Sequence, residues 1–327
     1  MSVLRSVTIG VLLACSMALP QAAYAQSRVA SYPDRPLRFL VGFAPGGSGD
    51  IVARLTAQKM MASLGQPVVV ENRVGAGGAI AADFVAKAPP DGYNWVLLPS
   101  GHATQGAMMK SLPYDPVKDF AWISTLTTYP MILAVSPGSQ ISTLAELIRL
   151  AKQSPGKLTY SSVGMGTGHH LLGEWLNAEA GMELTHVPFK GGTAAMTEVL
   201  AGRVDLMIET ITLALPHVRS GKMRGLAVSS RRPLAALPAV PAASDTLPAI
   251  EYESWLGIAV APGTPAEIVA RLNAEVRKAL ALPDIQRQLA DLGGGAAPSS
   301  PEEFRARVER DITRFRAIVD TRKIERQ

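Results

Sequence analysis

LRFLVGFAPGGSGDI, residues 37 to 51, is an apolar run that breaks into glycines and then resumes with the spacing of a helix. Residues 37 to 43 have the pattern of a buried strand, and Pro45-Gly46-Gly47 ends it. Apolar residues then recur at helical intervals, with Ser48 or Asp50 available to cap the helix. The stretch therefore predicts a strand, a glycine-rich turn and a helix start.

A turn of this kind directs free backbone N–H groups and the positive end of a helix dipole at one point, where glycine lets a ligand approach closely. It predicts an anion site, and the candidate residues are Phe43, Ala44, Pro45, Gly46, Gly47 and Asp50. The pattern lacks the lysine of a P-loop and the spacing of a dinucleotide fingerprint, which argues against a nucleotide. From these residues alone, a plain connection between strand and helix is an equal alternative.

The N-terminus has the pattern of a secretory signal peptide over residues 1–25. One cation, Arg5, precedes the apolar run Val7 to Leu19, and Ala23-Tyr24-Ala25 predicts cleavage after Ala25. The run is shorter than the ~20 residues of a membrane-spanning helix. Lipoprotein processing at Cys15 is the other alternative. We expect a protein exported to the periplasm.

Composition narrows the class of protein further. Removal of 25 of the 327 residues leaves 302 without cysteine, since Cys15 is the only one in the chain. Disulfides and thiol catalysis are therefore excluded from the mature chain, which is long enough for two domains stabilised by their cores. The formal net charge is +5, and basic residues are scattered except at the C-terminus, so we expect no binding to nucleic acid.

Strands and helices alternate after the opening loop, which predicts a parallel α/β sheet. In such sheets ligands bind beyond the carboxyl ends of the strands, where the loops 43 to 50, 72 to 78 and 99 to 104 would lie. The third of these loops adds the candidates Ser100, His102 and Thr104. Residues 120 to 126 and 131 to 135 have the pattern of two separate core segments.

A second unit shows the same strand, glycine-rich loop and helix pattern as the opening stretch. The predicted strand 158 to 162 leads into a glycine-rich loop and a helix, with the candidates Ser161, Gly166, Thr167 and His170. A loop at residues 189 to 193 adds Lys190 and Gly191, and the end of the next strand adds Glu209 and Thr210. Two such loops facing each other would form a clamshell cleft, which resembles a binding protein more than an enzyme.

The boundaries that we predict are residues 26–128 with 230–327 for the first domain and 129–229 for the second. Residues 226 to 229 are expected to form a strand that returns to the first domain. The acidic candidates Asp50 and Glu209 leave two roles open, because each could hold a loop or accept a ligand's amino group. Lys190 could pair with a ligand carboxylate or be solvated.

These residues closely resemble a known family, the periplasmic solute-binding subunits of tripartite tricarboxylate transporters, also called Bug receptors. The resemblance covers nearly the whole mature chain, and its motifs are Tyr32-Pro33-Asp34-Arg35-Pro36, Phe43-Ala44-Pro45-Gly46-Gly47 with Asp50, Glu71-Asn72-Arg73 with Gly75-Ala76-Gly77-Gly78, Ala88-Pro89-Pro90-Asp91-Gly92-Tyr93, Tyr114-Asp115-Pro116, Gly166-Thr167 with His170-Leu171, His186-Val187-Pro188-Phe189-Lys190-Gly191, Pro216-His217 and Ala261-Pro262-Gly263-Thr264-Pro265. Each motif is weak alone, but their order is specific.

The resemblance implies a type II periplasmic-binding-protein fold, with two α/β domains and a small carboxylate held between them. It also implies that the loop from Phe43 to Asp50 grips one carboxylate through backbone groups and waters, and that Gly166-Thr167 holds the other end. The sequence departs from the family at Glu209-Thr210, where many members carry Asp-Asn, and at Phe189, where Tyr is common. Ligand assignments made from relatives are therefore in doubt.

The function that we expect is capture of an organic acid or amino acid by a monomeric receptor, for delivery to the membrane subunits of such a transporter. Presentation of the solute to a membrane sensor kinase is the alternative, and an enzyme acting on a carboxylic acid ranks last because no nucleophile motif is present. No cofactor and no metal are expected. His102, His169 and His170 lack zinc-site spacing, and His169 is expected at the surface.

Overall fold

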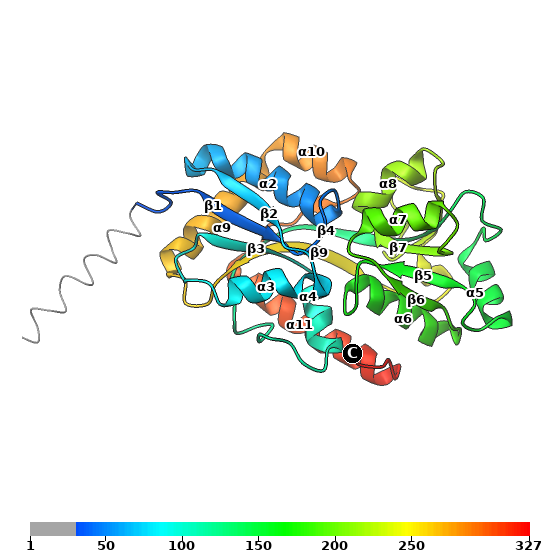
Figure 1. The fold of residues 1–327 in the computed structure, drawn as a ribbon. Helices are drawn as coiled ribbons and strands as arrows, with labels where there is room; N and C mark the ends of the chain where they lie inside the picture. The colour runs from blue at the N-terminus through cyan, green and yellow to red at the C-terminus, as the bar shows by residue number, and fades with distance from the viewer. Residues whose placement is uncertain (1–30) are drawn as a thin grey trace, which may run out of the picture.

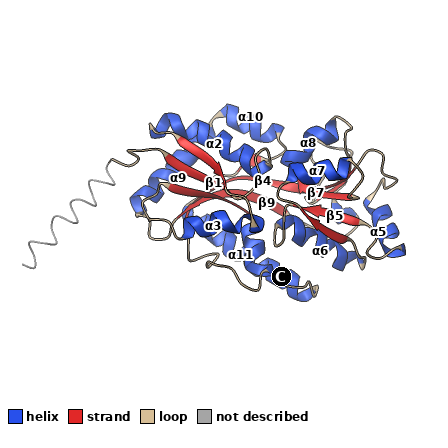
Figure 2. Cartoon of the chain, viewed as in Figure 1, coloured by secondary structure: helices blue, strands red, loops and turns tan. Residues whose placement is uncertain are grey.

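The computed structural model describes residues 31–327, so the predicted signal peptide of residues 1–25 lies outside the described residues. The described chain forms two lobes that lie side by side (Figure 1). In each lobe the strands form a central layer with helices on both faces (Figure 2). Two α/β lobes are what the sequence predicted.

The first lobe contains the N-terminal strands and the C-terminal helices. Its strands are β1 (Leu37–Val41), β2 (Val68–Asn72), β3 (Asn94–Pro99), β9 (Glu253–Val260) and β10 (Gly295–Ala296). Its helices are α2 (Ser48–Leu64), the short η1 (Ala76–Gly78), α3 (Ala79–Ala86), α4 (Gly101–Met108), α9 (Ala266–Ala281), α10 (Pro283–Asp291) and α11 (Pro301–Thr321).

The second lobe is formed by the middle of the chain. Its strands are β5 (Thr159–Ser162), β6 (Thr185–Pro188), β7 (Leu206–Thr210) and β8 (Arg224–Val228). Its helices are α5 (Leu144–Gln153), α6 (Gly168–Ala180), α7 (Gly192–Leu200), α8 (Ile211–Arg219) and the short η2 (Ala243–Asp245).

One long strand, β4 (Ala121–Val135), belongs to both lobes. Its residues 121 to 130 pair with β9 in the first lobe, and residues 131 to 135 pair with β7 and β8 in the second. The strands therefore join into one sheet with the order β2-β1-β3-β9-β4-β7-β5-β6. The sequence predicted two separate segments here, but the structure has one continuous strand.

The predicted parallel pairing holds within each lobe and fails where the lobes meet. β1 is parallel to β2 and β3, and β5 is parallel to β6 and β7. β4 and β9 run antiparallel to their neighbours, because these two strands bring the chain from one lobe to the other. The carboxyl ends of β1 and β3 consequently face those of β5 and β7 across the space between the lobes.

Residues 226 to 229 were predicted to form a strand that returns to the first domain, and this placement is wrong. It forms β8, which pairs with the second-lobe part of β4. The chain after it also stays on this lobe, because Val228 bridges to Ala242 and Arg219 Nε donates to the carbonyl of Ala236. The division of the chain at residues 128 and 229 stays a prediction, and these contacts favour a second crossing later than residue 242.

Alternation along the strands divides the core into two layers. In β1, Leu40 packs on one face of the sheet and Phe39 on the other, and in β4 Leu133 and Ile132 divide in the same way. Both layers continue through the two lobes. Because both faces of the sheet are covered, these strands have nearly continuous apolar runs, and such runs are the signal by which they were predicted.

Candidate functional site: a cavity between the lobes

A cavity of about 580 Å³, its mouth included, lies between the two lobes. The first lobe lines it with Phe43, Ala44, Gly47, Ser48, Gly49, Pro99, Ser100, Gly101, Ser254 and Leu256. The second lobe lines it with Val163, Thr167, Gly168, His169, Gly191, Gly192, Glu209, Thr210 and Leu213, and the shared strand β4 adds Tyr129 and Met131.

Five helices begin at this cavity. The residues that precede α2, α4, α6, α7 and α8 are Gly47, Ser100, Thr167, Gly191 and Thr210, and all five line it. At four of them no side chain caps the helix; at the fifth, Thr167 accepts a hydrogen bond from the N–H of His170. The first N–H groups of a helix have no partner within the helix and carry its positive dipole end. The cavity therefore suits an anion, although no lysine or arginine is among its lining residues within the described chain.

Asp50 holds the loop before α2 in shape from behind the cavity wall. Its carboxylate accepts hydrogen bonds from the N–H of Gly46 at 3.0 Å and from Asn72 Nδ2 at 3.0 Å, and Arg54 lies 2.9 Å away. Burial alone would raise the pKa of Asp50, but the hydrogen bonds from Arg54, Gly46 and Asn72 together lower it below its usual value. Of the two roles that the sequence left open for Asp50, these contacts support the structural one.

The network around Asp50 predicts a specific loss of stability in acid. Because the folded chain lowers the pKa of Asp50, the carboxylate stabilises the fold above its unfolded pKa of about 4, and this contribution disappears as pH falls through the folded value. Asp50→Asn should cost about 1 kcal/mol at pH 7. We expect the difference between this variant and the wild type, measured by urea unfolding, to shrink below pH 4. Asp320→Asn, which removes an exposed ion pair with Arg326, is the control and should change little. A difference that stays constant with pH would contradict the prediction.

The glycine-rich loop of the second lobe is held by His170. Its Nδ1 accepts a hydrogen bond from the N–H of Gly166 at 3.1 Å, and its ring stacks on His186. Burial, with a smaller contribution from the charge of His186, lowers the pKa of His170 to about 3. The ring is therefore neutral near pH 7 and able to accept this bond. This hydrogen bond supports a structural role for His170, which orients the loop from behind the cavity.

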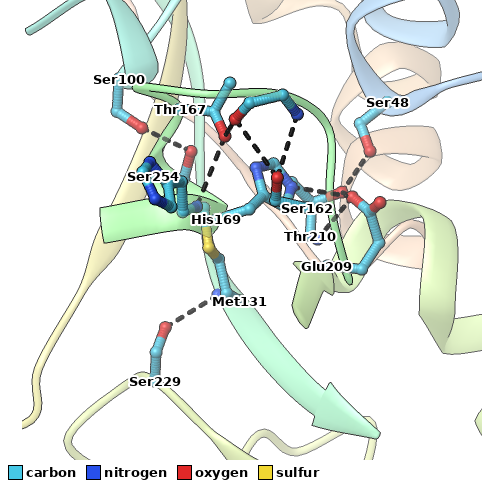
Figure 3. Close-up of polar contacts among 12 residues, drawn as sticks. Ser48, Ser100, Met131, Ser162, Thr167, His169, Glu209, Thr210, Ser229 and Ser254 are labelled. Carbon is cyan, nitrogen blue, oxygen red and sulfur yellow. Dashed lines mark hydrogen bonds and ion pairs between the residues drawn. The ribbon is translucent and has the colours of Figure 1, made fainter. Parts of the chain in front are cut away.

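Glu209 lies at the end of β7 and connects three elements at the cavity (Figure 3). Its Oε1 accepts hydrogen bonds from the N–H of Thr210 at 2.7 Å and from Thr210 Oγ1 at 2.9 Å, and it lies 3.1 Å from His169 Nε2. The Thr210 hydroxyl also hydrogen-bonds Ser48 in the first lobe. His169 is buried against Glu209, so its predicted place at the surface is wrong.

Eight of the predicted site residues line the cavity, and the others support its wall or lie outside it. Those in the lining are Phe43, Ala44, Gly47, Ser100, Thr167, Gly191, Glu209 and Thr210. Pro45, Gly46 and Lys190 are exposed, whereas Asp50, Thr104, Ser161, Gly166 and His170 are buried behind the lining.

His102 is the predicted site residue that the structure places elsewhere. Its Nε2 lies 2.7 Å from the carbonyl of Pro116, and its ring packs among Tyr114, Phe120 and Trp122. Burial lowers the pKa of His102 to about 4. The predicted polar loop at residues 99 to 104 is in fact the start of helix α4, and the first turn of that helix directs His102 into the core of the first lobe.

The two lobes are in contact around the cavity, and glycines allow this approach. A Cβ on Gly168 would lie 2.1 Å from the hydroxyl of Tyr252, and one on Gly77 would lie 2.8 Å from the carbonyl of Met165. A Cβ on Gly191 would lie 3.1 Å from that of Ala44. Several lining residues, such as Tyr129, Met131 and Ser254, were not predicted from the sequence. They come from segments that are far apart in the chain and meet only in the fold.

Two further properties bear on the class of site. Across residues 31–327, no three histidine, cysteine or acidic side chains gather closely enough to bind a metal ion. Within the same part of the chain, no helix combines the length and the apolar character of a membrane span.

Comparison with known proteins identifies relatives over most of the chain. Residues 52–324 match the model of the tripartite tricarboxylate transporter family receptor. A protein of the tcbD-tcbE intergenic region of Pseudomonas sp. strain P51 is 38% identical over 292 residues, which is 88% of this chain and 87% of the relative.

Solved structures share the two-lobed fold. MatC of Rhodopseudomonas palustris, solved with bound malate, is 33% identical, with a TM-score of 0.85 over 88% of this chain and 100% of MatC. A second R. palustris protein, solved with adipate, is 32% identical, with a TM-score of 0.86 over 90% of this chain and 99% of that protein. The predicted periplasmic-binding-protein fold is thereby confirmed.

Proposed function

The chain belongs to the tripartite tricarboxylate transporter receptor family, and we propose that it carries a small carboxylate to the membrane subunits of such a transporter. The observation that carries this proposal is the convergence of five helix N-termini on one cavity between the lobes. Backbone N–H groups at helix starts bind carboxylates without a cationic side chain. MatC and its R. palustris relative, which hold malate and adipate, support a small organic acid as the solute.

In the proposed mechanism, the first lobe binds one carboxylate at the starts of α2 and α4, through the N–H groups that follow Gly47 and Ser100. The second lobe then closes over the ligand with Thr167, Gly191 and Thr210. A ligand stabilises the closed form only through contacts that it makes better there than in the open form. The transporter would recognise this closed form, and no step of the cycle changes the ligand chemically.

The remaining parts of the proposal concern the cell. We propose that the protein is a monomeric receptor, exported by a signal peptide that is cleaved after Ala25. Growth of a strain lacking the gene on the ligand as sole carbon source tests the transport role, with the gene restored as the control. Unimpaired growth and uptake would contradict it.

The role of the α2 N-terminus can be tested at Ser48. Proline is tolerated at the first position of a helix, and the preceding Gly47 has the extended backbone (φ −79°, ψ 169°) that proline requires. Ser48→Pro therefore removes one N–H with little strain, while Ser48→Ala removes only the hydroxyl that bonds Thr210. We expect Ser48→Pro to bind the carboxylate at least about tenfold more weakly than Ser48→Ala, because a hydrogen bond to a charged group contributes about 1.5–3 kcal/mol.

The ligand is found first by a thermal-shift screen of the refolded mature protein, because a ligand that binds the folded state raises its melting temperature. Calorimetric titration of the carboxylate that gives the largest shift then measures the Kd of both Ser48 variants. Equal Kd values for Ser48→Pro and Ser48→Ala would show that this N–H does not contact the ligand.

A further inference from the structure

We propose that the solute of this receptor carries an ammonium group close to its carboxylate, and that Glu209 binds this group through Oε2. The inference rests on the proposed function, because it assigns the second end of the same ligand. It narrows the solute from carboxylates in general to amino acids and related zwitterions.

The first observation is an unpartnered oxygen on a buried acid. Glu209 is 3% exposed and lines the cavity, and its Oε1 receives the hydrogen bonds from Thr210 and faces His169. Its Oε2 is buried without a hydrogen-bond partner within the described chain. A buried acceptor without a partner is costly, so this oxygen is suited to receive a donor from the ligand.

The surroundings fix Glu209 in this position. Oε2 lies against Gly192 at the start of α7, where an added Cβ would be only 2.1 Å from it. The two bonds from Thr210 hold the other oxygen. The carboxylate therefore has a fixed direction and cannot turn to the solvent as a surface glutamate would.

Two helices begin beside Glu209. Thr210 is the residue before α8 and Gly191 the residue before α7, and neither helix has a side-chain cap. The positive dipole ends of two helices therefore meet at this carboxylate. The ring of His169 also contacts Glu209, with Nε2 3.1 Å from Oε1.

This negative charge discriminates between ligands. A second carboxylate placed near Oε2 would be repelled, because like charges interact strongly where water is excluded. An ammonium group would donate a hydrogen bond to Oε2 and neutralise the charge. The carboxylate end of the ligand lies nearby, since Ser48 at the start of α2 is linked through Thr210 to Glu209. The short link suits an ammonium group only a few bonds from the carboxylate.

The test compares matched acids on the wild-type protein by calorimetric titration. The probes are pairs that differ by the amino group, namely L-aspartate with succinate, L-glutamate with glutarate and 4-aminobutyrate with butyrate, together with malate and adipate. If the inference is right, at least one acid with an amino group binds at least about thirtyfold more tightly than the matched acid without it. A factor of this size is expected because removing one partner of a buried charge pair leaves the other charge unpaired.

The variant Glu209→Gln keeps the size and one carbonyl oxygen for the bonds from Thr210 but removes the charge. It should reduce binding of the amino acid at least about thirtyfold and should not weaken binding of the matched acid without an amino group. Glu198→Gln in α7 is the control, because it makes the same change in a surface ion pair with Arg203 and should leave both affinities unchanged.

The outcomes separate this inference from the proposed function. Equal binding of the two members of every pair, or tighter binding of succinate, glutarate or adipate by the wild type, would overturn the role of Glu209 and leave the carboxylate receptor standing. Binding of none of these acids, with binding of neutral sugars, would overturn both. A wild-type preference for the amino acid that Glu209→Gln retains would assign the preference to another residue and also overturn the inference.

Discussion

Gly168→Ala is expected to weaken ligand binding about 10- to 100-fold while the ligand-free protein keeps its stability. Gly168 begins α6 in the second lobe, and an added Cβ would lie 2.1 Å from the hydroxyl of Tyr252. Tyr252 cannot move aside easily, because its ring stacks on Phe315 and its hydroxyl lies 2.9 Å from Ser100 Oγ, both in the first lobe. The methyl group therefore obstructs the approach of the lobes.

The open form should tolerate the same change, since alanine is a better helix former than glycine. Calorimetric titration gives the affinity, and thermal unfolding without ligand gives the stability. Gly138→Ala is the control, because nothing lies within 4 Å of its added Cβ. In the double variant Gly168→Ala with Tyr252→Phe, loss of the hydroxyl should restore part of the affinity. Full affinity in Gly168→Ala alone would show that ligand binding does not require this contact.

Phe304→Ala is expected to lower the free energy of unfolding by about 3–5 kcal/mol. Phe304 in α11 is completely buried, and its ring meets Trp122 and Trp255 edge-on, with centroids 5.0 and 5.1 Å apart. It also covers Gly257 of β9, where an added Cβ would lie 2.3 Å from the ring. Truncation to alanine leaves a cavity, and the rigid tryptophan rings around it cannot move in to fill it.

Urea unfolding followed by tryptophan fluorescence and by circular dichroism measures this loss, and agreement of the two signals tests two-state behaviour. Ile80→Ala is the control, because its side chain is 51% exposed and its loss should cost less than about 0.5 kcal/mol. The ligand affinity of Phe304→Ala should be unchanged at temperatures where the variant is folded. A loss below about 1 kcal/mol would mean that this aromatic cluster contributes little to the core.

The sequence predicted those parts of the fold whose signals are local. The strand, turn and helix at residues 37 to 64 were recognisable because an apolar run, a glycine break and helical spacing follow one another directly. Helices α4, α8 and α10 were missed. Two glycines lie within α4 and Pro216 lies within α8, and both residue types obscure a helical pattern.

Site residues that belong to one local strand–turn–helix pattern could be predicted from the sequence. Contacts between residues that are distant in the chain could not. Gly47, Thr167 and Gly191 carry the mark of a strand end that leads into a helix, and all three line the cavity. The contact between His169 and Glu209 joins residues 40 positions apart, and no local sequence pattern predicts it. Asp50 shows the converse, because its sequence position suggested a ligand contact while its hydrogen bonds hold the loop from behind.

The shared strand β4 also limits how this protein can be divided. A fragment cut at residue 130 would expose the edges of β7 and β8 that pair with residues 131 to 135. Unpaired strand edges invite aggregation. Exchange of a whole lobe between two relatives must therefore carry the matching half of β4 with it, and the junction belongs at Pro130, where the pairing partner changes from β9 to β7 and β8. Chimaeras made at that point, with a second junction at the return crossing after residue 242, keep the pairing of β4 complete on both sides. This strand therefore sets one of the two boundaries at which evolution or design can recombine the halves of the clamshell.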